Sequence, residues 1–89
     1  MEITKQDAWD ILQATSAEMK RHNRKTIQVN PIHVRDFKIR LEEKGVKFVE
    51  RKERKMPSKE TMIFCIEAAA EFIEDVLGHE YNMIFVKEK

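Results

Sequence analysis

The sequence of 89 residues contains one cysteine, two glycines and two prolines, and each of these small numbers excludes something. A single cysteine rules out a disulfide within the chain and is typical of a reducing compartment, so we expect a cytoplasmic location. Two glycines are too few for a phosphate-binding loop. No stretch reaches the roughly 20 apolar residues of a transmembrane helix, and the polar first residues predict no secretory signal.

The sequence also has little of what catalysis and metal binding require. The three histidines, His22, His33 and His79, lack the spacing of a metal site, and no second cysteine is present to complete a zinc set. Cys65 lies within an apolar run, where we expect a buried thiol and not a nucleophile. We therefore predict a non-enzymatic protein with no catalytic residue, no metal and no cofactor.

Charged residues make up 37% of the chain, so much of its surface is solvated. Two groups of basic residues stand out, Lys20, Arg21, Arg24 and Lys25 in the first, and Arg51, Lys52, Arg54, Lys55 and Lys59 in the second. Lysine and arginine neutralise phosphates, so a regulator that binds RNA or DNA is the alternative hypothesis for function. Glutamates interspersed in the second group weaken this hypothesis.

Residues 1–25 have the pattern of an N-terminal helix. Thr4 is a typical N-cap, and Asp7 stands where a capping box places its acid. An apolar stripe follows at helical spacing, formed by Ala8, Leu12, Thr15 and Met19.

The next part of the chain has the signals of a strand, a helix and a second strand. Thr26–Val29 alternates polar and apolar residues, and Asn30-Pro31 is an N-cap followed by proline at the first helical position. The helix is expected to end near Lys44, with Gly45 as its left-handed terminator, and Val46–Lys52 is predicted to be a strand. The core stripe of this helix is formed by Val34, Phe37 and Leu41, whereas Ile32 and Ile39 fall on nearly the opposite side.

The stretch from Lys59 to Leu77 contains the longest apolar run and has two interpretations. It is either a strand at 61–66 followed by a helix at 67–77, or one continuous helix. The run is apolar without a break, which suits a strand buried on both faces, and Asn82–Lys87 nearly repeats it. One helix would bring Phe64 in line with acidic residues on the solvent side. We therefore predict the strand and helix, with the single helix as the alternative.

With a last strand at 81–86, these elements predict an α+β fold in a single domain, 1–89. The N-terminal helix (1–25) precedes a ferredoxin-like β-α-β-β-α-β unit (26–89) with a four-stranded antiparallel sheet. The alternative is a mostly helical protein in which residues 59–77 form one long helix. The order of elements resembles that of RNA-recognition motifs, although the first strand has no aromatic residue and the third has no glycine.

Five large apolar residues are in surplus to the predicted core, namely Trp9, Ile11, Ile32, Ile39 and Phe85. Exposed apolar patches mark interaction surfaces, although the first helix is an alternative cover within the chain. We therefore expect a small interaction or regulatory protein that binds another protein and self-associates, most simply as a homodimer. No feature predicts a membrane partner.

Overall fold

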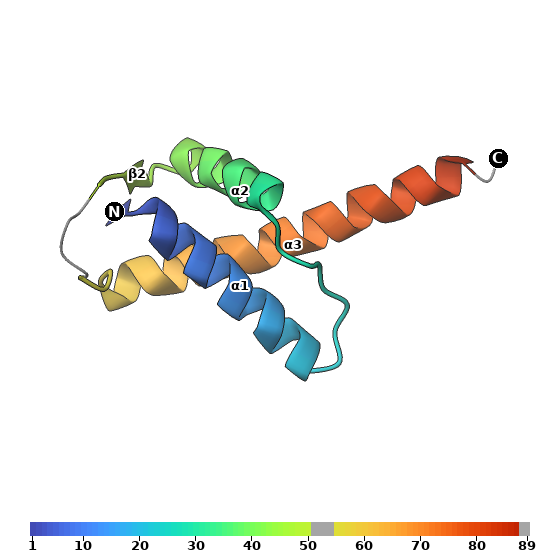
Figure 1. Ribbon diagram of the computed structural model, residues 1–89, viewed down its shortest axis with the longest axis horizontal. Coiled ribbons are helices and arrows are strands. Elements are labelled where there is room, and N and C mark those ends of the chain that lie inside the picture. The colour runs from blue at the N-terminus through green and yellow to red at the C-terminus, as the bar shows by residue number, and fades with distance from the viewer. Residues whose placement is uncertain (51–54, 88–89) are drawn as a thin grey trace.

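A computed structural model describes the backbone of residues 1–50 and 55–87 and the side chains of residues 1–50 and 55–78. Within these residues it has three helices and a two-stranded sheet, in the order β1 (Glu2–Ile3), α1 (Lys5–Arg21), α2 (Pro31–Glu43), β2 (Lys47–Phe48) and α3 (Lys59–Lys87). α1 and α2 pack against the first part of α3 and against each other. The last part of α3 projects from this body (Figure 1).

The start of α1 is the capping box that the sequence predicts. The Asp7 N–H donates to the Thr4 hydroxyl oxygen at 3.1 Å, and the Thr4 N–H donates to an Asp7 carboxylate oxygen at 2.9 Å. Two of the N–H groups that lack a partner within the helix are thereby satisfied. The buried side of α1 includes Ala8, Leu12, Thr15 and Met19, so the predicted stripe is confirmed.

Both ends of α2 are also set by local sequence. The Asn30 side-chain oxygen accepts from the N–H groups of Ile32 at 3.0 Å and His33 at 3.2 Å, and Pro31 occupies the first helical position. Gly45 follows the helix with φ of 95°, a left-handed conformation that side chains with a Cβ rarely adopt.

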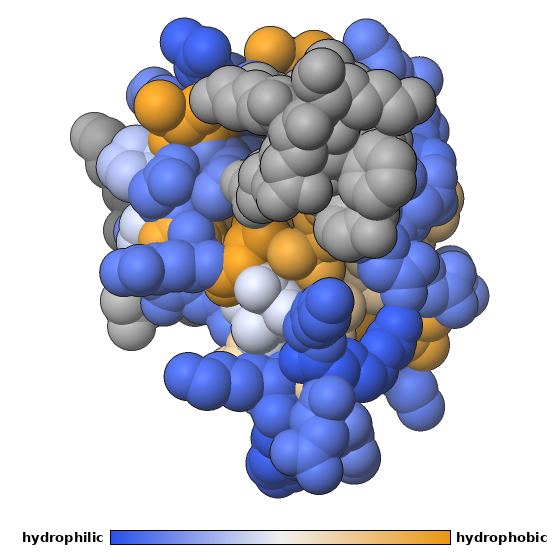
Figure 2. Space-filling view, turned by 90° about the vertical axis from the view of Figure 1, so that its right-hand side faces the viewer, coloured by the Kyte–Doolittle hydropathy of each residue, from blue (hydrophilic) through white to orange (hydrophobic). Residues whose placement is uncertain are grey.

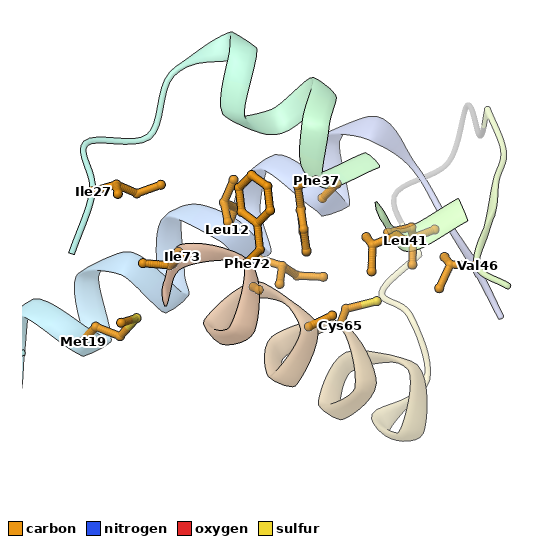
Figure 3. Close-up of a cluster of buried hydrophobic side chains, with 14 residues drawn as sticks. Leu12, Met19, Ile27, Phe37, Leu41, Val46, Cys65, Phe72 and Ile73 are labelled. Carbon is orange, nitrogen blue, oxygen red and sulfur yellow. The ribbon is translucent and has the colours of Figure 1, made fainter. Parts of the chain in front are cut away.

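The core lies where the three helices meet (Figure 3). Phe37 of α2 and Phe72 of α3 pack with ring centroids 5.6 Å apart and planes at 42°. Leu12 of α1 lies beside them, as Figure 3 shows. The buried apolar residues are Ile3, Ala8, Ile11, Leu12, Met19, Ile27, Phe37, Leu41, Val46, Cys65, Ala68, Ala69, Phe72 and Ile73.

The two strands join the beginning of the chain to the segment that follows α2. They pair in parallel, with Ile3 opposite Phe48. Flanking hydrogen bonds extend the pairing, from the Lys47 N–H to the Met1 carbonyl at 2.8 Å and from the Val49 N–H to the Ile3 carbonyl at 2.9 Å. Ile3 is thereby fully buried, so this short sheet closes one end of the core.

The predicted ferredoxin-like α+β fold is wrong, because the described residues contain no four-stranded antiparallel sheet. Residues 61–66 and 81–86, expected as strands, are helical. Of the expected strand Val46–Lys52, residues 51 and 52 lie outside the described part, and within 46–50 only Lys47–Phe48 is a strand. Thr26–Val29 pairs with no strand. Instead, the Ser16 hydroxyl holds this segment to α1, donating to the Ile27 carbonyl at 2.8 Å.

The alternative of a mostly helical chain is correct, and the last helix is longer than expected. Ser58 starts α3, since its side-chain oxygen accepts from the Thr61 N–H at 3.3 Å and its carbonyl accepts from the Met62 N–H at 2.9 Å. The expected helix 67–77 stops just before Gly78, but α3 continues through this glycine to Lys87. Although α3 has 29 residues, no described helix is long and apolar enough to cross a membrane.

The helix prevails at residues 61–66 because one of its sides completes the core. Cys65, Ala69 and Phe72 recur at helical spacing and are 0–4% exposed. On the other side Ile63 and Ile66 remain 48% and 43% exposed. The prediction of a strand assumed that large apolar groups avoid the solvent side of a helix. That assumption is wrong for α3, which exposes Ile63 and Ile66.

Candidate functional site

A groove with a volume of about 550 Å³ runs between α2 and α3. One wall comes from the side of α2 that faces away from the Phe37 stripe, and the other comes from α3. The lining residues are Ile32, His33, Asp36, Ile39, Arg40, Glu43, Phe72, Asp75 and Val76. Figure 2 looks toward the end of the molecule from which α3 projects, and it shows hydrophobic surface there within a hydrophilic surround.

Two isoleucines give the α2 wall its apolar character. Ile32 and Ile39 are seven residues apart, so they lie two turns apart on one side of the helix. They are 62% and 49% exposed. The orientation of α2 is set by Phe37 and Leu41, which are fully buried, and this leaves both isoleucines outside the core. Each therefore offers apolar surface that no described part of the chain covers.

The opposite wall is held in place by an aromatic ring and an ion pair. Phe72, which is 4% exposed, lies below the Arg40 guanidinium, whose central carbon is 5.3 Å from the ring centroid. Arg40 also pairs with Asp75, and Lys44 lies 3.9 Å from Glu71 one turn further on. These two pairs show that α2 and α3 run antiparallel beside the groove. The groove thus combines an apolar wall with charged groups along its rim.

Among the described side chains, the Nδ1 atom of His33 is the one buried nitrogen or oxygen without a hydrogen-bond partner. His33 lies in the groove wall. The residue as a whole is half-buried. A buried polar atom without a partner costs stability. The sequence analysis assigned His33 no role, and the structure places it at the groove wall.

The surplus apolar residues of the sequence have different positions in the structure. Ile32 and Ile39 line the groove, whereas Ile11 is 4% exposed and belongs to the core. Trp9 is half-buried on α1. The side chain of Phe85 lies outside the described residues, but its backbone belongs to the projecting part of α3.

The α3 wall of the groove was missed by the sequence analysis. Phe72 and Val76 belong to the expected helix 67–77, but nothing local indicates that they face α2. Arg40 and Asp75, 35 residues apart, carry no pairing signal in one sequence. The only sequence signal for the groove was the second apolar side of α2, formed by Ile32 and Ile39.

The first basic group lies at the C-terminal end of α1 and just beyond it. Arg21 pairs with Glu18 at 2.6 Å, and Arg24 pairs with Glu74 of α3. The hydrogen bond between Glu18 and His22 is the main reason that the pKa of the Glu18 carboxyl is lowered from its ordinary value, and Arg21 lowers this pKa further. Two of the basic side chains are therefore engaged with carboxylates, while Lys20 and Lys25 are exposed.

The second basic group lies only partly within the described residues. Arg51, Lys52 and Arg54 fall outside them, whereas Lys55 and Lys59 are exposed at the start of α3. This start lies well away from the C-terminal end of α1 (Figure 1). The described residues therefore form no continuous basic surface that joins the two groups.

Cys65 is fully buried in the core, where α3 faces α1 and α2 (Figure 3). Burial raises the pKa of its thiol, and the Asp7 carboxylate raises it further. A nucleophilic cysteine needs the opposite shift and access from solvent. Its position therefore suits a packing residue.

Alkylation of Cys65 is expected to be slow in the folded protein. Iodoacetamide should react at least about tenfold faster once the chain is unfolded in urea, because the folded state hides the thiol and keeps it protonated.

Urea titrations at several pH values provide a second measurement. A thiol pKa that is higher in the folded state makes the free energy of unfolding fall as the pH rises above about 8.5. Cys65→Ala should remove this part of the slope, and an unchanged slope would contradict the raised pKa.

The described residues contain no group of three or more histidine, cysteine, aspartate or glutamate side chains arranged to hold a metal ion. The groove between α2 and α3 is lined by apolar side chains, with charged groups along its rim. No protein-family model matches the chain, and no curated protein or solved structure is significantly similar to it.

Proposed function

We propose that this chain is a non-enzymatic interaction protein that binds a helix of a protein partner in the groove between α2 and α3. The observation that carries the proposal is the exposure of Ile32 and Ile39, which lie two turns apart on one wall of a groove with Phe72 and Val76 on its other wall. Amphipathic helices bind grooves of this kind through apolar residues spaced three, four and seven apart.

The dimensions of the groove agree with a helical partner. Its α2 wall extends from Ile32 to Glu43, a rise of about 16 Å at 1.5 Å per residue. That length accommodates about three turns of a second helix. Burying an isoleucine that is fully exposed gains about 1.5–3 kcal/mol, and one that is half-exposed gains about half as much. Ile32 and Ile39 together therefore supply a modest, reversible affinity.

The charged residues around the groove support binding in preference to catalysis. Asp75 is engaged by Arg40, and Asp36 lies 3.9 Å from Arg35. Charged groups at the rim of an interface select and orient a partner more than they add affinity. The single, buried cysteine supports a reducing compartment, which we take to be the cytoplasm.

Site-specific photo-crosslinking in the source cell tests the proposal. A benzophenone side chain at position 39 should give a protein adduct, because this position faces the occupant of the groove. Glu42 is the matched control, since it is exposed on the same helix but does not line the groove. We expect at least about fivefold more adduct at position 39 than at position 42, in keeping with occupancy of one specific site. Equal adduct at both positions, or none at position 39, would refute the proposal.

A further inference from the structure

The projecting part of α3 is the starting point for identifying the occupant of the groove. α3 continues through Gly78 to Lys87, and Figure 1 shows this segment leaving α1 and α2 behind. The segment rises by about 14 Å at 1.5 Å per residue. We call residues 78–87 the α3 end.

The composition of the α3 end is unusual for a helix in water. Five of the six residues from Tyr81 to Val86 are large and apolar. A helix gains most of its stability from packing an apolar side against other elements, and so short an extension has little stability of its own. This composition favours a cover from outside the three-helix body.

The groove and the α3 end match in length and lie close together in the sequence of α3. The groove wall on α2 rises by about 16 Å and the α3 end by about 14 Å. Asp75 and Val76, which line the groove, precede the α3 end directly. The groove therefore ends close to the point of α3 where a helical segment of apolar composition begins.

We propose that the groove holds the α3 end of a second copy of this chain, and that two copies exchange their α3 ends in a symmetric homodimer. This inference rests on the proposed function and names the partner. If two α3 helices cross antiparallel near Gly78, each α3 end lies along the partner's α3 from Leu77 back toward Glu71, which is the α3 wall of the groove. The contact is self-complementary, as a two-fold symmetric interface requires, and it occurs twice.

Charge agrees with this direction of crossing. The C-terminal end of the exchanged helix points toward the part of the groove that contains Glu43 and lies near Glu71. Glu43 makes no ion pair with the other described side chains. In the sequence, the exchanged segment ends at Lys87, and Glu88 and Lys89 follow it, so these three residues carry a net charge of +1. Basic residues thus approach the acidic rim, which favours this orientation over the reverse.

A complementation experiment tests the exchange. Ile39→Asp places a charge in the groove, and the double variant Ile84→Asp/Phe85→Asp places charges on the α3 end. Each variant alone should weaken dimerisation at least about tenfold in sedimentation equilibrium, because the lost apolar contact occurs twice in a symmetric dimer. A mixture of the two variants should dimerise more tightly than either alone, since one groove and one α3 end remain intact.

Ile66→Asp is the matched control, because Ile66 is 43% exposed on α3 but does not line the groove. This variant should dimerise as the unchanged chain does. Circular dichroism should show that all variants keep the helix content of the three-helix body, since none of them replaces a residue of the described core.

Each of the other outcomes has a definite meaning. An unchanged chain that sediments as a monomer would overturn the exchange, while an adduct of position 39 with a different protein would leave the proposed function standing. Dimerisation that survives Ile84→Asp/Phe85→Asp, or that is lost in Ile66→Asp, would place the dimer contact elsewhere. Failure of the mixture to recover would also overturn the exchange.

Discussion

Replacement of Glu67 by proline is expected to lower the free energy of unfolding by about 3 kcal/mol or more. Glu67 is exposed in the interior of α3, so its side chain contributes little packing. Proline removes the hydrogen bond from this position to the carbonyl of Ile63, and its ring collides with that carbonyl. The loss falls beside Cys65 and Ala68 in the core, so a local break also loosens the packing of α3 on α1 and α2.

Urea unfolding followed by circular dichroism measures this effect, and two variants serve as controls. Lys59→Pro occupies the first position of α3, where proline is tolerated. Glu67→Ala keeps the helix and removes the same side chain, so its effect should stay within about 0.5 kcal/mol. If Glu67→Pro were as stable as Lys59→Pro, a helix would have to begin near residue 67, as the strand-and-helix interpretation requires.

Phe37→Ala is the second substitution with a large expected effect, a loss of about 3–5 kcal/mol. Phe37 is fully buried and packs against Phe72, which also forms part of the groove wall. Small domains have a total stability of about 5–15 kcal/mol, so this loss is a large part of the whole. It should lower the melting temperature by at least about 12 °C, since each 1 kcal/mol corresponds to roughly 4–8 °C in a domain of this size.

Calorimetry or thermal circular dichroism checks the effect of Phe37→Ala, with Ile39→Ala as the control. Ile39 lies two residues away on the same helix but is 49% exposed, so its truncation should cost less than about 1 kcal/mol. The pair separates folding from binding, because only Ile39→Ala should weaken the proposed interface while the fold remains. Equal losses in the two variants would contradict the orientation of α2.

The helix starts were predictable because the groups that make them are close together in the chain. The side chains of Thr4 and Asp7 accept from each other's backbone N–H groups, and the Asn30 side chain accepts from the N–H groups of Ile32 and His33. Pro31, at the first helical position, has no N–H group that would need a partner. Gly45 ends α2 for an equally local reason, since its φ of 95° suits glycine. None of these interactions needs a distant part of the chain.

The prediction of a strand at 61–66 was wrong because the apolar run can be buried either as a strand or as a helix. The two differ in the elements that must pack against the run, and the local sequence does not show those elements. A strand needs neighbouring strands, but residues 81–86 are helical, Thr26–Val29 pairs with no strand, and Lys47–Phe48 pairs with Glu2–Ile3 instead. A helix needs one apolar side, and Cys65, Ala68 and Ala69 provide a side with little bulk that lets α3 approach α1 and α2. The expected helix 67–77 was too short because glycine costs a helix only about 1 kcal/mol. Gly78 therefore does not by itself end α3.

The candidate site was predicted on one wall only. Ile32 and Ile39 stood out because a helix with a core stripe at Phe37 and Leu41 has no place for them inside. Their counterparts on α3 were hidden, since Phe72 and Val76 have the spacing of ordinary core residues. The two basic groups, within 20–25 and 51–59, lie on different parts of the molecule as far as it is described.

The sequence by itself determined where α1 and α2 begin, how α2 ends, four of the six residues that α1 buries, and that α2 carries apolar residues on two sides. Capping and periodicity act over a few residues, so they can be inferred from one chain. Tertiary structure alone decided that α3 is one helix, that it runs antiparallel to α2, and that a groove opens between them. Those features depend on contacts such as Phe37 with Phe72 and Arg40 with Asp75, which join residues 35 positions apart. A single sequence contains the partners of such contacts but not their pairing.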